Sequence, residues 1–285
     1  MSRINIIGFG FVGSAMGSLC EHAGLEYSVY DTMTKSGKFN YYSSLNTLIT
    51  TAEEKYTEPV YYFICVPTPS DIDGSCNILI IDKVLEEMRN TIKNNNSVIF
   101  IKSTVKPGTC NNFSTKYPEL NIIFCPEFLR EKTAKEDVIN ADFVLFGIDD
   151  KFNRLLCEGV YELFRELYKH NSDIRLLLHT YEECELFKYT INCFLATKVW
   201  FFNEIYQVCD KLDVTYDNLC NLLKLDARIG ESHTQVPGHD GHFGYGLSCF
   251  PKEMRGMSFL QNELGIDNNI LSSIIKRNDW MRTLE

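Results

Sequence analysis

A glycine motif near the start of the chain limits the possible folds most strongly. The sequence G-F-G-F-V-G at residues 8–13 directly follows a short apolar run at residues 3–7 and opens an amphipathic stretch. Glycines at this spacing allow a tight turn between a strand and a helix, and they let a pyrophosphate approach the helix N-terminus. Asp31 ends the next apolar run, 18 residues after Gly13, where a carboxylate can accept hydrogen bonds from a ribose. The arrangement predicts a Rossmann-type dinucleotide site that prefers NAD to NADP.

Short β-type runs continue to alternate with amphipathic stretches as far as about residue 180. This pattern is typical of a parallel sheet covered by helices. Besides residues 3–7, we expect strands at residues 26–30, 60–66, 97–102, 121–125 and 143–147. Several of these runs are almost entirely apolar, as strands are when both faces of the sheet are covered. The predicted fold class is therefore α/β, with a doubly wound parallel sheet.

The character of the sequence changes near residue 180. Large apolar residues then recur every three or four positions from residue 181 to residue 212, which predicts one long helix. A glycine-rich loop follows at residues 230–246, and a further helix is expected to begin at Pro251 and end near Gly265. We therefore predict two domains, a dinucleotide-binding domain at residues 1–180 and a mainly helical domain at residues 181–285.

Composition argues against several classes of partner and location. The 285 residues include 38 acidic and 28 basic side chains, and the net charge of −10 disfavours binding to nucleic acid or to an anionic membrane. The 11 cysteines contain no C-x-x-C pair, which fits a reducing compartment better than a disulfide framework. No apolar run is long enough to span a membrane, and the first residues do not resemble a signal peptide. We expect a cytoplasmic protein.

Three loops should meet at the carboxyl edge of the sheet, where folds of this kind bind ligands. They have the sequences V-P-T-P at residues 66–69, S-T-V at 103–105 and P-E-F-L-R-E at 126–131. Glu127 and Glu131 are four residues apart, as are Lys188 and Asn192 in the long helix. Either pair could lie on one side of a functional site, or on a solvated helix face.

Cys249 has the most informative surroundings of the cysteines. It lies in G-L-S-C-F-P-K-E at residues 246–253, and Pro251 suits the first position of a helix. The helix N-terminus and Lys252 would both favour the thiolate, which is the nucleophilic form. The alternative is that Cys249 is a small buried apolar residue. His233, His239 and His242 lie near Asp240, but their spacing matches no standard ligand pattern, so no metal is expected.

Taken in order, these motifs resemble those of the UDP-glucose/GDP-mannose dehydrogenase family. The matching segments are residues 8–13, 66–69, 103–105, 126–131, 188–198, 228–230 and 246–253. The resemblance extends to about Asn278, and the chain stops where the family's third domain, which closes over the nucleotide, would begin. Members of the family oxidise a nucleotide sugar twice at C6 with NAD. The resemblance therefore implies NAD as cofactor and a nucleotide sugar, UDP-glucose first, as substrate.

The resemblance also implies roles for individual residues. Cys249 would capture the C6 aldehyde as a thiohemiacetal, which becomes a thioester and is then hydrolysed. Lys188 and Asn192 would stabilise the C6 oxygen. The residues implied to hold the catalytic water or move protons are Thr104, Glu127, Glu131 and, beside the thiol, Glu253. Cofactor contacts are expected at Gly8, Gly10, Phe11, Val12, Gly13, Asp31, Lys35, Thr68, Ser103, Thr104, Glu131 and Lys252. Substrate contacts are expected at Glu127, Phe128, Leu129, Lys188, Asn192, Arg228, Tyr245 and Gly246.

The sequence departs from the family pattern near the thiol. Leu247 replaces the second glycine of the usual G-G-S-C-F-x-K-D, and Glu253 replaces the aspartate; the loop at residues 232–241 is longer than in common members. In the family the long helix forms the core of a two-fold dimer, and an arginine similar to Arg228 reaches the neighbouring subunit's substrate, so a homodimer is expected. Two other functions stay open. One is an NAD-binding protein with impaired catalysis that acts as a binding or assembly partner, and the other is a β-hydroxyacid dehydrogenase.

Overall fold

The computed structural model describes residues 3–56, 58–130, 132–150, 152, 154–247 and 249–283. The chain divides into two compact units, and each is described by itself. The first unit consists of Met1–Pro69 and Asn77–Lys188, and the second of Ser70–Cys76 and Tyr189–Glu285. None of the described helices is both long enough and apolar enough to cross a membrane.

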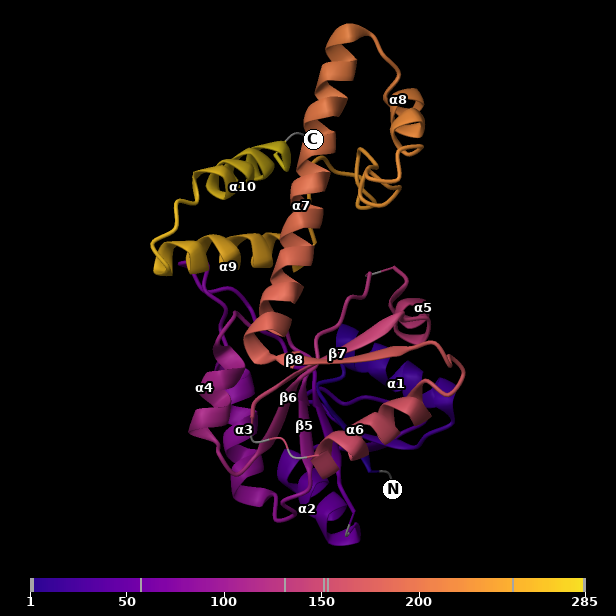
Figure 1. Cartoon of the computed structure of the whole chain (residues 1–285), viewed down its shortest axis with the longest axis vertical. Coiled ribbons are helices and arrows are strands. Elements are labelled where there is room, and N and C mark those ends of the chain that lie inside the picture. Colours follow the sequence, from indigo (N-terminus) through magenta and orange to yellow (C-terminus); the bar gives the residue numbers. More distant parts are fainter. Residues whose placement is uncertain are drawn as a thin grey trace. The chain divides into compact units, whose positions relative to one another are not determined.

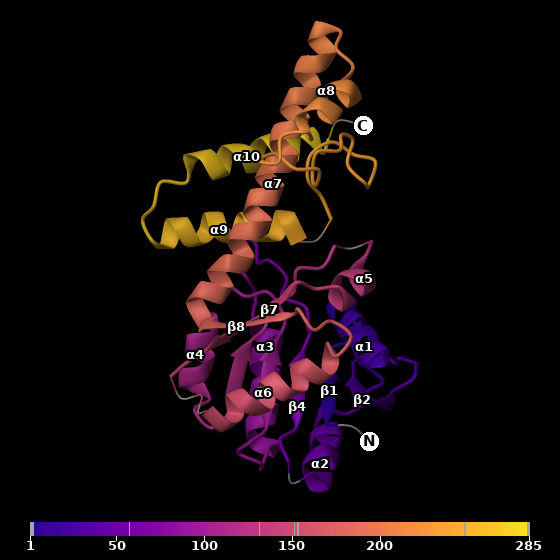
Figure 2. The same cartoon turned by 45° about the vertical axis from the view of Figure 1, so that its right-hand side comes forward.

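The first unit is built on a sheet whose strands, among the described residues, follow the order β3-β2-β1-β4-β5-β6-β7-β8 (Figures 1 and 2). Neighbouring strands are parallel except β6 and β7, which pair in antiparallel fashion. The predicted α/β class is confirmed, and the six predicted strands are present within two residues of their expected bounds. The strands are β1 Ile4–Ile7, β2 Tyr27–Tyr30, β3 Asn40–Tyr42, β4 Tyr61–Ile64, β5 Val98–Ile101, β6 Asn121–Phe124, β7 Phe143–Ile148 and β8 Arg175–Thr180.

Helices cover both faces of this sheet. One apolar core contains alternate strand residues such as Ile6 and Phe63 and is covered by α1, α5 and α6. The other contains the intervening residues, such as Ile7 and Ile64, and is covered by α2, α3 and α4 (Figures 1 and 2). This two-sided burial explains why the central strands are apolar throughout. The helices are α1 Phe11–Ala23, α2 Leu45–Lys55, α3 Leu79–Thr91, α4 Thr109–Lys116, α5 Ala134–Ile139 and α6 Arg154–Leu167.

The second unit is helical in its described residues. Its elements are the greater part of α7 Tyr181–Leu212, then α8 Tyr216–Leu223, α9 Cys249–Glu263 and α10 Asn269–Met281. α9 and α10 pack on one side of α7 around Met254 and Ile274, and α8 packs near its far end around Phe202 and Tyr216 (Figure 1). The long helix has the predicted bounds. α9, however, begins at Cys249, two residues before Pro251, because a proline is tolerated anywhere in the first turn, where amides have no intrahelical acceptor.

Candidate active site

The glycine turn after β1 has the close approaches that its sequence predicts. Gly8 has a φ of +88°, and a Cβ there would lie 2.9 Å from the carbonyl oxygen of Cys65. A Cβ on Gly13 would overlap the carbonyl oxygen of Gly8, so only glycine fits. A Cβ on Gly10, in contrast, would meet nothing within 4 Å. The backbone therefore packs tightly at Gly8 and Gly13, whereas space remains beside Gly10, the N-cap of α1.

The surroundings of this turn fit a dinucleotide. Within the described residues, no side chain caps the N-terminus of α1 and its first turn carries no acidic residue, which leaves the amides suited to a phosphate. The carboxylate of Asp31 accepts hydrogen bonds from the backbone N–H of Phe9 (2.6 Å) and of Met33 (2.8 Å). The Nζ of Lys35 lies 4.0 Å from the same carboxylate. Asp31 is thus fixed beside the turn, where a ribose hydroxyl would be recognised.

The loops after β4 and β5 are joined by two buried hydroxyl groups. Thr68 Oγ1 donates to the carbonyl oxygen of Thr104 at 2.8 Å, and Ser103 Oγ donates to that of Val66 at 2.7 Å. Both hydrogen bonds cross from one loop to the other at the carboxyl edge of the sheet. The predicted residues of these loops therefore lie together, as their positions after neighbouring parallel strands require.

Glu127 and Lys188 form a buried ion pair at the same edge. Lys188 Nζ donates to the backbone oxygen of Glu127 at 2.6 Å and lies 3.4 Å from Oε1 of its carboxylate. The side chains are only 9% and 3% exposed, so neither belongs to a solvated face. Oε2 of Glu127 accepts a hydrogen bond from the backbone N–H of Leu129 at 2.7 Å, and the ammonium lies 5.3 Å from the centre of the Phe128 ring. Glu131 lies outside the described residues.

In the second unit, Asn192 Nδ2 donates to Oε2 of Glu253 at 2.7 Å, and both side chains are buried. Glu253 follows Cys249 by one turn of α9. Cys249 is exposed, whereas the ten other cysteines are buried or half-buried. Cys249 therefore does not have the surroundings of an apolar filler. Lys252, in the same first turn, is half-buried.

The other predicted substrate residues have different surroundings. Arg228 is exposed, and its guanidinium pairs with Asp226 at 2.5 Å. Tyr245 is buried in the core of the second unit. Gly246 precedes Leu247, which has a left-handed backbone with a φ of +62°.

Three buried polar residues carry no sequence signal. Glu185 in α7 accepts hydrogen bonds from the backbone N–H groups of Gly108 (2.6 Å) and Cys110 (2.8 Å) and so caps α4. Burial raises the pKa of Glu185 to about 7, although these hydrogen bonds act to lower it. In the second unit, Asn203 and Asn278 bond the loop before Cys249. Helical periodicity alone does not indicate a role for Glu185, Asn203 or Asn278.

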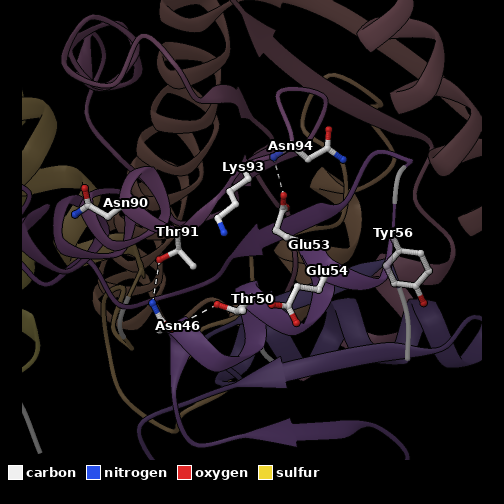
Figure 3. A pocket seen from close by; sticks show the side chains of 9 residues that line it. All are labelled: Asn46, Thr50, Glu53, Glu54, Tyr56, Asn90, Thr91, Lys93 and Asn94. Carbon is white, nitrogen blue, oxygen red and sulfur yellow. Dashed lines mark hydrogen bonds between the residues drawn. The ribbon is translucent and has the colours of Figure 1, made fainter.

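A cavity of about 530 Å³ lies elsewhere, near the amino ends of β4 and β5. It is lined by polar side chains from α2 and from the end of α3 and the loop that follows it (Figure 3). Glu53 is held by the backbone N–H of Asn94 at 2.9 Å and by the hydroxyl groups of Tyr62 and Ser97. None of the predicted site residues lines this cavity. Within the described residues, no group of three or more His, Cys, Asp or Glu side chains is placed to hold a metal ion.

Known sequences relate the whole chain to one group of enzymes. Models of the UDP-glucose/GDP-mannose dehydrogenase family match residues 41–170 as the NAD binding domain and residues 182–280 as the central domain. The UDP-glucose 6-dehydrogenases of Rickettsia typhi and Rickettsia bellii are each 31% identical to this chain over 97% of its length. The chain spans 66% of the length of each.

Solved structures share the fold at lower identity. A UDP-glucose dehydrogenase from Pyrobaculum islandicum is 23% identical with a TM-score of 0.79, over 98% of this chain and 68% of that one. A 3-hydroxyisobutyrate dehydrogenase from Mycobacterium tuberculosis is 13% identical with a TM-score of 0.73, over 98% of this chain and 93% of that one. These likenesses show the fold, whereas the sequence matches show the family. The chain therefore belongs to the UDP-glucose/GDP-mannose dehydrogenase family, with the family's NAD-binding domain followed by its central domain.

Proposed function

We propose that the chain oxidises the C6 hydroxyl group of a nucleotide sugar, with UDP-glucose as the first candidate, to a carboxylate. The observation that carries this proposal is the exposure of Cys249 at the first residue of α9, in a chain whose other cysteines are buried or half-buried. A helix N-terminus favours the thiolate form. NAD, when bound, accepts the hydride in each of the two oxidations.

Cys249 supplies the covalent step. Its thiolate attacks the C6 aldehyde, so that a C–S bond forms while the carbonyl electron pair moves to oxygen. Loss of a hydride from this thiohemiacetal gives a thioester. Water then adds to the thioester carbon, the C–S bond breaks and the sulfur leaves as a thiolate. Covalent capture retains the aldehyde between the two oxidations.

Lys188 and Glu127 are suited to the charge and proton changes of this sequence. The Lys188 side chain is 3% exposed, and a cation in such a low-dielectric setting stabilises an alkoxide more strongly than one in water. We assign it to the C6 oxygen. The Glu127 carboxylate is fixed by its hydrogen bond from Leu129, and we assign it, with Thr104 and Glu131, to the water and its proton.

Asn192 and Glu253 form a second pair, in the unit that carries Cys249. Their hydrogen bond of 2.7 Å joins α7 to the first turn of α9. We assign the Asn192 amide to the C6 oxygen and the Glu253 carboxylate to proton transfer beside the thiol. The buried Glu253 carboxylate accepts this hydrogen bond, so Asn192 contributes to the orientation of Glu253. An Asn192→Ala change should therefore impair catalysis through both residues.

We also propose that the chain forms a homodimer through α7. Phe194, Phe201 and Val208 are separated by seven residues each, so they lie on one side of the helix, and all three are at least half exposed. A row of large exposed apolar side chains on a single helix is typical of an interface. A second copy of the same helix would cover it under two-fold symmetry.

The function is tested by mixing the protein with NAD and a panel of nucleotide sugars and following NADH. We expect two NADH per sugar oxidised, and a Cys249→Ser variant that makes no uronic acid yet still binds NAD. A Cys157→Ser variant, which changes a half-buried thiol in α6, should keep its activity and serves as the control. The absence of NADH with every nucleotide sugar at high protein concentration would exclude this function.

A second function, NAD binding with impaired turnover, is favoured by Leu247. Leu247, two residues before Cys249, has an exposed side chain and a left-handed backbone at a position where the family usually has glycine. Calorimetry would then detect NAD binding while no sugar produced even a stoichiometric burst of NADH. Including 3-hydroxyisobutyrate in the same panel tests the hydroxyacid alternative. The Mycobacterium tuberculosis 3-hydroxyisobutyrate dehydrogenase resembles this chain in fold alone.

A further inference from the structure

The loop that leads to Cys249 is held by one amide side chain of α10. Asn278 accepts a hydrogen bond from the backbone N–H of Tyr245 at 2.7 Å and donates to the carbonyl oxygen of the same residue at 3.0 Å. Asn278 is 2% exposed, and Tyr245 belongs to no helix or strand. Both backbone groups of Tyr245 are thus satisfied by Asn278, where a regular element would have supplied backbone partners.

A second contact from the C-terminus of α10 follows one residue later. Arg282, the C-cap of α10, lies flat against Gly246, where an added Cβ would be 2.6 Å from the guanidinium carbon. The guanidinium is fixed in turn by Asp240, with 2.7 Å between Arg282 Nη1 and Asp240 Oδ2. Burial raises the pKa of Asp240, but the hydrogen bonds from Arg282 and from the His242 backbone outweigh it and hold that pKa below its ordinary value. Asp240 therefore carries a charge in neutral solution.

The loop fits these two side chains closely. A Cβ on Gly244 would lie 2.5 Å from Oδ1 of Asn278, and one on Gly246 would collide with Arg282. The backbone N–H of Gly244 is also bonded by Asn203 of α7 at 2.9 Å. Residues 244–246 are therefore fixed from α7 on one side and α10 on the other, three residues before the thiol.

We infer that Asn278 and Arg282, with Asp240, are positioning residues that place the Cys249 thiol for reaction. The inference rests on the proposed function of Cys249. Reacting groups must be held to within about 0.5 Å, and a shift of about 1 Å can cost a hundredfold in rate. Because Gly246 precedes Cys249 by only three residues, we expect a displaced loop to shift the first residue of α9. Asn278 and Arg282 themselves act through the loop.

The inference is tested with Arg282→Ala and a matched control, Arg277→Ala. Arg277 lies in the same helix, pairs with Glu204 at 2.8 Å and stacks on Trp280. We expect Arg282→Ala to lower kcat at least tenfold while KM for NAD stays within twofold. Alkylation of Cys249 by iodoacetamide at pH 7, measured by mass spectrometry of its peptide, should slow at least threefold, because the thiol loses its ordered helix N-terminus. Arg277→Ala should change neither quantity.

Alkylation requires neither substrate nor NAD, so it separates this inference from the proposed function. If the wild-type protein shows no turnover, the function fails while the alkylation rates still test the positioning of the thiol. If thermal denaturation shows that Arg282→Ala is not folded, Asp240→Asn is used instead. This second variant removes the ion pair and leaves the guanidinium of Arg282 in place. A wild-type alkylation rate and kcat in the folded variant would overturn the inference.

Discussion

Leu247 adopts a backbone conformation that favours glycine. Its φ of +62° brings the Cβ close to the following carbonyl oxygen, which costs roughly 1–2 kcal/mol in a residue with a side chain. The side chain is 60% exposed, so little packing offsets this cost. The strain lies two residues before the thiol, at a position where backbone strain commonly accompanies function.

We therefore expect Leu247→Gly to raise the free energy of unfolding by about 0.5–1 kcal/mol, after allowing for the greater freedom of glycine in the unfolded chain. Urea denaturation at neutral pH provides the measurement. Leu247→Ala is the control, since alanine keeps the Cβ and its strain while removing the exposed side chain. A Leu247→Gly protein no more stable than Leu247→Ala would show that the left-handed conformation is not strained.

Glu185 couples the stability of the first unit to pH. Burial raises its pKa in the folded chain to about 7, compared with 4.5 for an ordinary glutamic acid. Below pH 4.5 both the folded and unfolded chains hold the proton. Between pH 4.5 and 7 the unfolded chain loses it while the folded chain retains it, so stability falls as pH rises through this window. Above pH 7 the full loss remains, about 3 kcal/mol for a shift of this size.

A Glu185→Gln variant should lose this dependence. Between pH 5 and pH 8 the wild-type free energy of unfolding should fall by about 2–3 kcal/mol more than that of Glu185→Gln. Glu166→Gln, an exposed position in α6, is the control and should follow the wild-type curve. Parallel curves for wild type and Glu185→Gln would mean that Glu185 is ionised throughout this range in the folded chain.

At the scale of single elements, the apolar row on α7 makes the dimer testable. Phe201 lies in the middle of the row and is 50% exposed, so the folded subunit gains little from burying it. Phe201→Glu should therefore give a folded monomer, since two carboxylates would meet near the two-fold axis. Light scattering at micromolar concentration measures the change. Leu225→Glu, an exposed leucine beyond α8, should stay dimeric. Equal masses for wild type and Phe201→Glu would locate the interface elsewhere or show that none exists.

Sequence patterns predict those helices, strands and turns that are determined by residues close together in the chain. The glycine turn, the apolar central strands and the long helix each depend on residues close together in the chain. β3 and β8 were not predicted, because both lie at sheet edges where a strand is short or partly exposed and does not need a continuous apolar run. The start of α9 was misplaced because proline marks a first turn without fixing its first residue.

The contacts that fix the site are mostly distant in sequence. Asn278 and Tyr245 are 33 residues apart, and Glu185 lies 75 residues from Cys110. Spacing also left Glu127 and Lys188 open as solvated residues, and only their burial against each other, 61 residues apart, decides between the two interpretations. A motif can thus indicate the residues that meet a ligand, whereas the side chains that orient them need the folded chain.

At the scale of the whole molecule, the exposed Arg228 suggests a site completed by two subunits. Its side chain is 89% exposed, and its guanidinium pairs with Asp226, which precedes it by only two residues. A planar guanidinium is suited to bidentate binding of a phosphate, and at this exposure it can reach a ligand held by another copy of the chain. We expect Arg228→Ala to raise KM for the nucleotide sugar about tenfold, the loss of a charge-assisted contact, without changing NAD affinity or dimerisation.

Mixing Arg228→Ala with Cys249→Ser tests whether the arginine acts across the dimer. After subunit exchange about half of the dimers are mixed, and each mixed dimer has one site with both an intact Arg228 and an intact Cys249, so about a quarter of all sites should recover wild-type KM. If Arg228 acted within its own subunit, every site would carry one of the two changes, and the mixture would show only the average of the separate variants. Activity measured at a sugar concentration well below the KM of Arg228→Ala distinguishes these results. Exchange is verified beforehand by native mass spectrometry of the mixed dimers, so that a lack of recovery counts directly against a shared site.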